Sequence, residues 1–129
     1  DGSEKMCAIA NKNTGLEIKC INFLEFAEEN KYDGIWACAS LVHLTKEDLI
    51  ETLKKLAKAL KKDGYIYTTF KVGTFEGIRN GRYFIDMDEN KFKEILKHIN
   101  VLKLEKVYYN TSTLKNQHNK SWINFILKK

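Results

Sequence analysis

The feature that most constrains the fold is an apolar run without alternation near the middle of the chain. Residues 35–39 read Ile-Trp-Ala-Cys-Ala, with no polar residue among them. A strand that buries one face alternates apolar and polar residues, whereas a strand covered by helices on both faces reads as a continuous apolar run. We therefore expect residues 32–40 to form a central strand of an α/β sheet.

Helix and strand signals alternate around this run. Ser3, Thr45 and Asp88 are placed to cap helices, and Leu49, Leu53, Leu56 and Leu60 form one apolar stripe on the second of them. Further strands are expected at 16–21, 65–71, 101–109 and 122–127, and a short helical turn at 23–29. The last two strands have no helix between them, so we expect an α/β domain over 1–129, mostly parallel, with a C-terminal antiparallel hairpin.

Composition excludes several classes of protein. The 22 lysines and arginines exceed the 17 aspartates and glutamates by five, but the lysines are scattered, which favours a solvated surface over a nucleic-acid footprint. An RNA-binding or RNA-modifying protein remains an alternative. The longest uncharged run, 34–45, is too short to span a membrane.

The cysteines indicate a reducing environment. Their count is three and no pair has Cys-x-x-Cys spacing, so neither a disulfide framework nor a zinc site is predicted. Cys20 and Cys38 end apolar runs, and we expect both to be small buried residues. A cytoplasmic location follows from this pattern.

The segment 72–84 is a glycine-spaced loop in this interpretation. Its glycines lack the Gly-x-Gly-x-x-Gly pattern, which argues against a phosphate cradle. The loop follows strand 65–71, at the sheet edge where open α/β sheets bind ligands. The chain's two arginines, Arg79 and Arg82, both lie in it. Because arginine suits planar anions, an anionic ligand or a substrate carboxylate is favoured over loop packing.

His43 lies just beyond the carboxyl end of strand 32–40. By position it is a candidate general base or substrate contact. The alternative, a histidine hydrogen-bonded near the start of the next helix, is equally consistent with the sequence. No histidine or carboxylate spacing predicts a metal site, and no Ser-His-Asp arrangement can be argued.

Four stretches together resemble the class I S-adenosylmethionine-dependent methyltransferases, in particular the small-molecule, tellurite-resistance-like branch. Residues 1–6 (Asp-Gly-Ser-Glu-Lys-Met) resemble the turn after the family's second strand, and 32–43 resemble its fourth strand and following loop. Residues 62–65 (Lys-Asp-Gly-Tyr) resemble the turn into strand five. Phe-Lys-Val-Gly at 70–73 and Gly-Arg-Tyr-Phe at 81–84 resemble the loop that follows strand five. The likeness covers essentially the whole chain and implies a Rossmann-like fold.

The resemblance also implies roles for individual residues. S-adenosylmethionine would be the cofactor, and a small molecule would accept the methyl group. Asp1 would accept hydrogen bonds from the ribose, Met6 and Phe23 would contact the adenine, and Asn22 would accept a bond from the adenine amino group. Ala39 and Ser40 would border the methionine part. His43 would be the proton acceptor, and the substrate would face Lys71, Arg79 and Arg82.

The family's first strand, glycine-rich loop and second strand have no counterpart before Asp1. In the family's sheet order, 3-2-1-4-5-7-6, two strands would separate the segment 16–21 from the strand 32–40. We therefore expect a domain that is incomplete at its N-terminus, with an exposed edge on strand 32–40. It would be the C-terminal piece of a longer enzyme, or a second chain would fill the gap. The alternative to an enzyme is a non-catalytic, methyltransferase-like module that self-associates through that edge.

Overall fold

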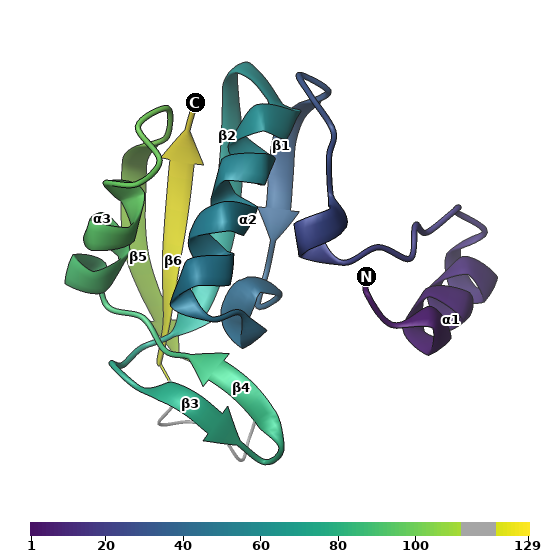
Figure 1. Ribbon diagram of the computed structural model, residues 1–129, viewed down its shortest axis with the longest axis horizontal. Helices are drawn as coiled ribbons and strands as arrows, with labels where there is room; N and C mark the ends of the chain where they lie inside the picture. Colours follow the sequence, from purple (N-terminus) through teal and green to yellow (C-terminus); the bar gives the residue numbers. More distant parts are fainter. Residues whose placement is uncertain (112–120) are drawn as a thin grey trace.

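The centre of the fold is a four-stranded sheet with the order β1-β2-β6-β5 (Figure 1). The computed structural model describes residues 1–111 and 121–129. The strands are β1 (Tyr32–Ala37), β2 (Leu60–Lys71), β5 (Lys103–Thr111) and β6 (Ser121–Lys128). β1 and β2 are parallel, while β6 runs antiparallel to both β2 and β5. This confirms the α/β class and the C-terminal antiparallel hairpin, and the order matches 4-5-7-6 of the expected family.

Two helices cover one face of this sheet, α2 (Lys46–Ala59) and α3 (Glu89–Leu96) (Figure 1). Each begins at the expected cap: the Thr45 hydroxyl accepts from the Asp48 amide at 3.1 Å, and the Asp88 carboxylate accepts from the Lys91 amide at 2.7 Å. The leucine stripe of α2 is buried, as predicted.

Aromatic side chains fill the core between α3 and the sheet. Phe92 of α3 stacks on Phe125 of β6 with 3.8 Å between ring centroids, and Phe70 of β2 lies 6.0 Å from Phe92. All three are fully buried. Burial of these three aromatic rings fixes α3 against β2 and β6, the strands that carry the candidate site.

The other face of the sheet carries no helix within the described residues. Trp36 of β1 lies on that face, 74% exposed, and stacks on Tyr67 of β2 at 3.9 Å. The prediction that β1 is a central strand covered on both faces is therefore wrong for the described residues. In the part of the chain that the structure describes, β1 lies at one edge of the sheet, paired with β2.

The first part of the chain contains α1 (Glu4–Thr14), which lies beside the sheet, and the short helix η1 (Phe23–Glu25) (Figure 1). The strand predicted at 16–21 is absent. This segment makes one parallel-type exchange, in which Asp1 N donates to Lys19 O at 3.3 Å and Ile21 N donates to Asp1 O at 2.9 Å. Its apolar pattern suits a strand, but among the described residues only Asp1 pairs with it through the backbone.

The loop predicted at 72–84 contains a β-hairpin instead, formed by β3 (Glu76–Arg79) and β4 (Arg82–Ile85). Its two-residue turn is Asn80-Gly81, and both residues have positive φ, 49° and 76°. This is the geometry of a type I′ turn, for which Asn-Gly is the favoured sequence. Asn-Gly therefore predicts a hairpin at this position, but the glycine spacing was given more weight.

An irregular stretch near the start of β2 explains one further glycine. Asp63 has φ 64°, and a Cβ added to Gly64 would lie 3.0 Å from the Asp33 and Lys61 carbonyl oxygens. Only glycine fits this close approach, which brings this part of β2 against the backbone of Asp33 in β1.

All three cysteines are free, but two are not buried. Cys20 and Cys38 are exposed, while Cys7 is buried. Cys20 lies on the segment 16–21, which forms no strand, and Cys38 lies just beyond β1. A side-chain hydrogen bond with Cys7 raises the pKa of the Cys20 thiol. No helix in the described residues is long and apolar enough to cross a membrane.

Candidate functional site

The candidate site lies at the carboxyl edge of the sheet. β1 and β2 end there, β6 begins there, and the short helix η2 (Leu41–His43) follows β1 directly. Ala39 occupies the turn between β1 and η2 with φ 48°. The hairpin β3–β4 leaves the end of β2 and returns beside η2, so residues distant in sequence meet at this edge.

His43 is held by the hairpin. Its Nδ1 lies 2.9 Å from the carbonyl oxygen of Tyr83, and its ring meets the Phe84 ring edge-on at 4.5 Å between centroids. A carbonyl can only accept, so Nδ1 carries the proton in this hydrogen bond. In the neutral ring Nε2 is then the acceptor nitrogen. Both interpretations of His43 made from the sequence are therefore compatible: one nitrogen is structural and the other is available.

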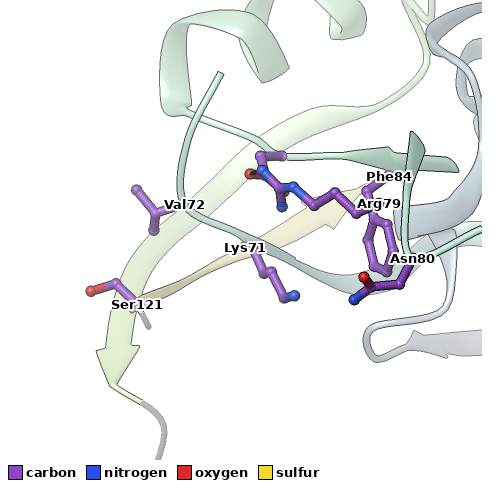
Figure 2. A pocket seen from close by; sticks show the side chains of 7 residues that line it. Lys71, Val72, Arg79, Asn80, Phe84 and Ser121 are labelled. Atoms are coloured by element: carbon purple, nitrogen blue, oxygen red, sulfur yellow. Dashed lines mark hydrogen bonds and ion pairs between the residues drawn. The ribbon is translucent and has the colours of Figure 1, made fainter. Parts of the chain in front are cut away.

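Two adjoining cavities surround this histidine and the end of β2. The first, here called the histidine cavity, has a volume of about 270 Å³ and is lined by Ala39, Val42, His43, Lys71, Phe84, Ile85, Asp86 and Trp122. The second, the hairpin cavity, has about 580 Å³ and is lined by Lys71, Val72, Arg79, Asn80, Phe84, Asp86 and Ser121 (Figure 2). They share Lys71, Phe84 and Asp86, so they lie next to each other along the sheet edge.

Arg79 is bound within the protein. Its guanidinium makes two hydrogen bonds to Asp86, Nη1 to Oδ1 at 3.0 Å and Nη2 to Oδ2 at 2.6 Å. Asp86 is 6% exposed, and Arg79 also stacks over the Phe75 ring at 3.9 Å. Such a bidentate pair ties the end of β3 to the residue that follows β4. The local geometry therefore gives Arg79 the packing role that the sequence analysis had ranked second.

A third cavity of about 300 Å³ lies between β1 and the N-terminal segment. It is lined by Asp1, Ile21, Asn22, Phe23, Phe26, Tyr32, Gly34, Ile35 and Leu56. Three residues predicted to bind a cofactor, Asp1, Asn22 and Phe23, thus meet at one cavity. The Asn22 side-chain oxygen caps η1 by accepting from Leu24 N at 3.0 Å, and Asp1 Oδ1 accepts from Ser3 N at 2.8 Å.

The remaining predicted residues lie outside this N-terminal cavity. Met6 is 54% exposed on α1 and lines none of the cavities described here. Ala39 lines the histidine cavity, and Ser40 stands at the start of η2 with no side-chain capping bond. Arg82 is exposed at the start of β4, beyond the two cavities. The predicted set is therefore divided between the N-terminal cavity and the carboxyl edge of the sheet, and Met6 and Arg82 line neither.

Sequence reasoning missed Tyr83, Phe84, Asp86 and Trp122 as site residues. Phe84 and Trp122 form apolar walls, Tyr83 supplies the carbonyl for His43, and Asp86 binds Arg79. The Asn-Gly turn would have placed Tyr83 and Phe84 on a strand. Nothing in the sequence pairs Asp86 with Arg79, because their contact depends on the hairpin register.

A hydrogen-bonded network borders the site on the helix-free face. The Tyr67 hydroxyl donates to Asn124 Oδ1 at 2.6 Å, and Asn124 Nδ2 donates to Asn110 Oδ1 at 2.6 Å. Burial raises the pKa of Tyr67, so it remains a neutral donor. Because the network joins β2, β6 and β5, it fixes the strand ends from which Lys71 and Trp122 project.

Comparison with known proteins identifies the family. The model of a family described as AdoMet dependent proline di-methyltransferase matches residues 3–112. The chain belongs to this family of AdoMet-dependent methyltransferases. AdoMet is S-adenosylmethionine, so the cofactor and the enzyme class expected from the sequence are confirmed at the level of the family. No curated protein matches the sequence.

Solved structures agree on the methyltransferase fold. A SAM-dependent methyltransferase from Methanosarcina mazei superposes with a TM-score of 0.82 at 13% identity, covering 100% of this chain and 79% of that one. A SAM-dependent methyltransferase from Leishmania major has a TM-score of 0.79 at 14% identity, covering 98% of this chain and 52% of that one. The Burkholderia thailandensis 1,6-didemethyltoxoflavin-N1-methyltransferase, solved with S-adenosylhomocysteine, has a TM-score of 0.73 at 14% identity and covers 95% and 55%. The methyltransferase chain described here is thus shorter than all three.

Proposed function

We propose that the chain serves S-adenosylmethionine-dependent methyl transfer to a small molecule bound at the carboxyl edge of the sheet. The observation that carries the proposal is the arrangement of His43. One ring nitrogen is fixed by the Tyr83 carbonyl, and the ring lines a cavity that also contains Lys71 and Phe84.

The N-terminal cavity suits the nucleoside end of the cofactor. Its walls are largely apolar, with Phe23 available to contact a planar base, and Asp1 and Asn22 bring polar groups to it. The second carboxylate oxygen of Asp1 is available to a ribose hydroxyl, since the hydrogen bond from Ser3 uses Oδ1. Ala39 would border the amino-acid end. When bound, the cofactor supplies an electrophilic methyl group on a sulfonium sulfur.

His43 acts on the acceptor. An N–H or O–H nucleophile gains a bond to the methyl carbon as the carbon–sulfur bond breaks, and its proton must leave. Nε2 of the neutral imidazole takes that proton, while the Nδ1–H bond to Tyr83 keeps the ring oriented. Holding the acceptor in line with the methyl group accounts for the remaining rate enhancement, so the reaction requires no catalytic triad.

A proline nitrogen is a second candidate acceptor. The matched family is described as proline di-methyltransferase, and a secondary amine must lose a proton before it can be methylated. The unprotonated nitrogen of His43 provides for that step. L-proline therefore belongs in the first set of acceptors assayed, together with uncharged and anionic small molecules.

Binding of S-adenosylhomocysteine to the 129-residue chain tests the cofactor site. Calorimetry should detect saturable binding, and NMR shifts should appear at residues 21–23 and 34–35. Phe23→Ala should weaken binding at least tenfold if burial of the base against the ring contributes about 1.5 kcal/mol or more. Leu24→Ala is the matched control, because Leu24 lies on the same short helix and does not line the cavity. Absence of binding, or equal affinities for both variants, would count against the proposed function.

We further propose a cytoplasmic location, supported by the three free thiols. The non-enzymatic alternative, a module that pairs through the edge of β1, makes a different prediction: self-association without cofactor binding.

A further inference from the structure

Lys71 stands out among the cations around the two adjoining cavities. It lies at the end of β2, half-buried, with its Nζ 5.1 Å from the centroid of the Phe84 ring. In Figure 2 it stands between Val72 and Ser121 on one side and Arg79, Asn80 and Phe84 on the other. Within residues 1–111 and 121–129, no carboxylate lies within ion-pair distance of its ammonium.

The other charged groups nearby have partners. Both oxygens of Asp86 bind Arg79, and Lys91 contacts Glu76 at 3.3 Å. Residues 112–120, which follow β5 in the chain, contain no aspartate or glutamate. Lys71 is thus a partly desolvated cation in a hollow whose one lining carboxylate is already neutralised. Such a group is stabilised by an anion from solution.

The remaining polar side chains of the hairpin cavity are also donors. Asn80 offers an amide N–H and Ser121 a hydroxyl, and both line the same cavity as Lys71. Phe84 supplies an apolar wall to this cavity and to the histidine cavity. An anionic group held at Lys71 therefore places the rest of the same molecule against Phe84 and beside His43.

We propose that Lys71 determines acceptor specificity, and that the acceptor is a small molecule with a carboxylate or phosphate next to an apolar, planar portion. This inference rests on the proposed function and names its substrate class. It separates the three basic residues expected to face the substrate: Lys71 binds the anion, Arg79 positions the hairpin through Asp86, and Arg82 lies outside the site.

The test uses three probes of one shape: benzoate and phenyl phosphate as anions, and benzamide as the uncharged match. Each is titrated into the full chain and followed by amide NMR shifts around Lys71, Asn80 and Ser121. We expect either or both anions to bind more tightly than benzamide, the stronger of them showing which anion the site prefers. Lys71→Met should lower anion affinity about tenfold or more, the usual effect of losing a charged hydrogen bond. Lys71→Arg should retain most of it.

Lys106→Met is the matched control. Lys106 also lies over an aromatic ring, Tyr108 at 5.5 Å, and its loss changes the net charge equally. Equal weakening by both substitutions, binding of benzamide as tight as that of the anions, or no anion binding would overturn the inference. So would an equal loss of S-adenosylhomocysteine affinity in Lys71→Met, because Lys71 would then serve the cofactor. Binding of S-adenosylhomocysteine is measured in a separate titration. If the unsubstituted chain does not bind it, the proposed function is contradicted, and the anion titration still tests the role of Lys71.

Discussion

At the scale of single residues, the two nitrogens of His43 have different tasks. Nδ1 donates a hydrogen bond to the Tyr83 carbonyl oxygen at 2.9 Å, and Nε2 is the nitrogen that accepts the proton in the proposed reaction. The amide N–H of an asparagine side chain can occupy the place of Nδ1–H but offers no basic nitrogen. Position 43 therefore allows orientation and proton transfer to be separated by one substitution.

We predict that His43→Asn lowers kcat by about 10²–10⁴, the usual contribution of a general base. Its unfolding midpoint in urea should stay close to that of the unsubstituted chain, whereas His43→Leu should lower both. S-adenosylhomocysteine release measures turnover. His98→Asn, at an exposed histidine in the turn after α3, is the control and should change neither quantity. Unchanged turnover in His43→Asn would contradict a role of His43 as general base and would leave it only the structural hydrogen bond to Tyr83.

The site residues differ in how far sequence could predict them. His43 was singled out because it follows a strand that its own apolar pattern identifies, whereas Lys71 was singled out only through the family resemblance. The role of Arg79 was not predicted, because nothing local to position 79 indicates a carboxylate seven residues later on the neighbouring strand. Position in the chain thus identifies candidate residues near strand ends. Side chains that strand pairing brings together, such as Arg79 and Asp86, are identified only from the structure.

At the scale of secondary-structure elements, the β3–β4 hairpin shapes the site, and its turn depends on Gly81. Gly81 has φ 76°, and a Cβ there would touch nothing within 4 Å. Substitution with alanine therefore introduces conformational strain without a clash. We expect Gly81→Ala to destabilise the hairpin by about 1–2 kcal/mol, seen as faster amide hydrogen exchange in residues 76–85. Gly2→Ala, at a glycine without positive φ, should leave exchange unchanged. Equal exchange in Gly81→Ala would mean that the turn tolerates a side chain.

Glu28 makes the connection before β1 sensitive to acid. It binds Lys31 at 2.9 Å and Lys19 at 3.1 Å, and these hydrogen bonds, first to Lys31 and then to Lys19, hold the pKa of its carboxyl below the usual range. Because the folded-state pKa is lowered, the stabilisation is present above the ordinary glutamate pKa of about 4.3 and is lost as pH falls through the lower folded value.

NMR of the Glu28 carboxyl carbon should therefore give a titration midpoint below that of a free glutamate. Amide protection in residues 18–21 should fall over the same pH range. Glu28→Gln should remove this pH dependence, whereas Glu17→Gln should preserve it. If amide protection in residues 18–21 falls equally with pH in Glu28→Gln and Glu17→Gln, the acid sensitivity comes from other groups.

The two elements that were predicted wrongly have different causes. Residues 16–21 have a strand-like sequence, but a strand forms only where a partner backbone supplies its hydrogen bonds. Residues 72–84 were expected to be a loop because glycine spacing was weighed above the Asn-Gly pair. The helices were predicted more closely, because their hydrogen bonds and caps lie within one segment.

At the scale of the whole molecule, the two edges of the sheet differ. β5 forms one edge and carries Lys103, Glu105 and Lys106, charges that oppose pairing with another strand. β1 forms the other edge, has no lysine, and carries Trp36 with most of its surface exposed. In the described residues no strand pairs with the outer side of β1. The edge of β1 is therefore the side of the sheet from which association is expected.

We predict that the 129-residue chain self-associates reversibly through β1, and that light scattering over a dilution series measures a mass that rises with concentration. Trp36→Lys adds a charge to this edge and removes the exposed ring, so it should shift the chain to monomer. Tyr109→Lys makes the same kind of change on β5, where the edge is already charged, and should leave the association unchanged. A chain that stays monomeric throughout, or variants that act equally, would contradict a role for the β1 edge. Association that S-adenosylhomocysteine strengthens would link that edge to the N-terminal cavity, because Gly34 and Ile35 of β1 line it.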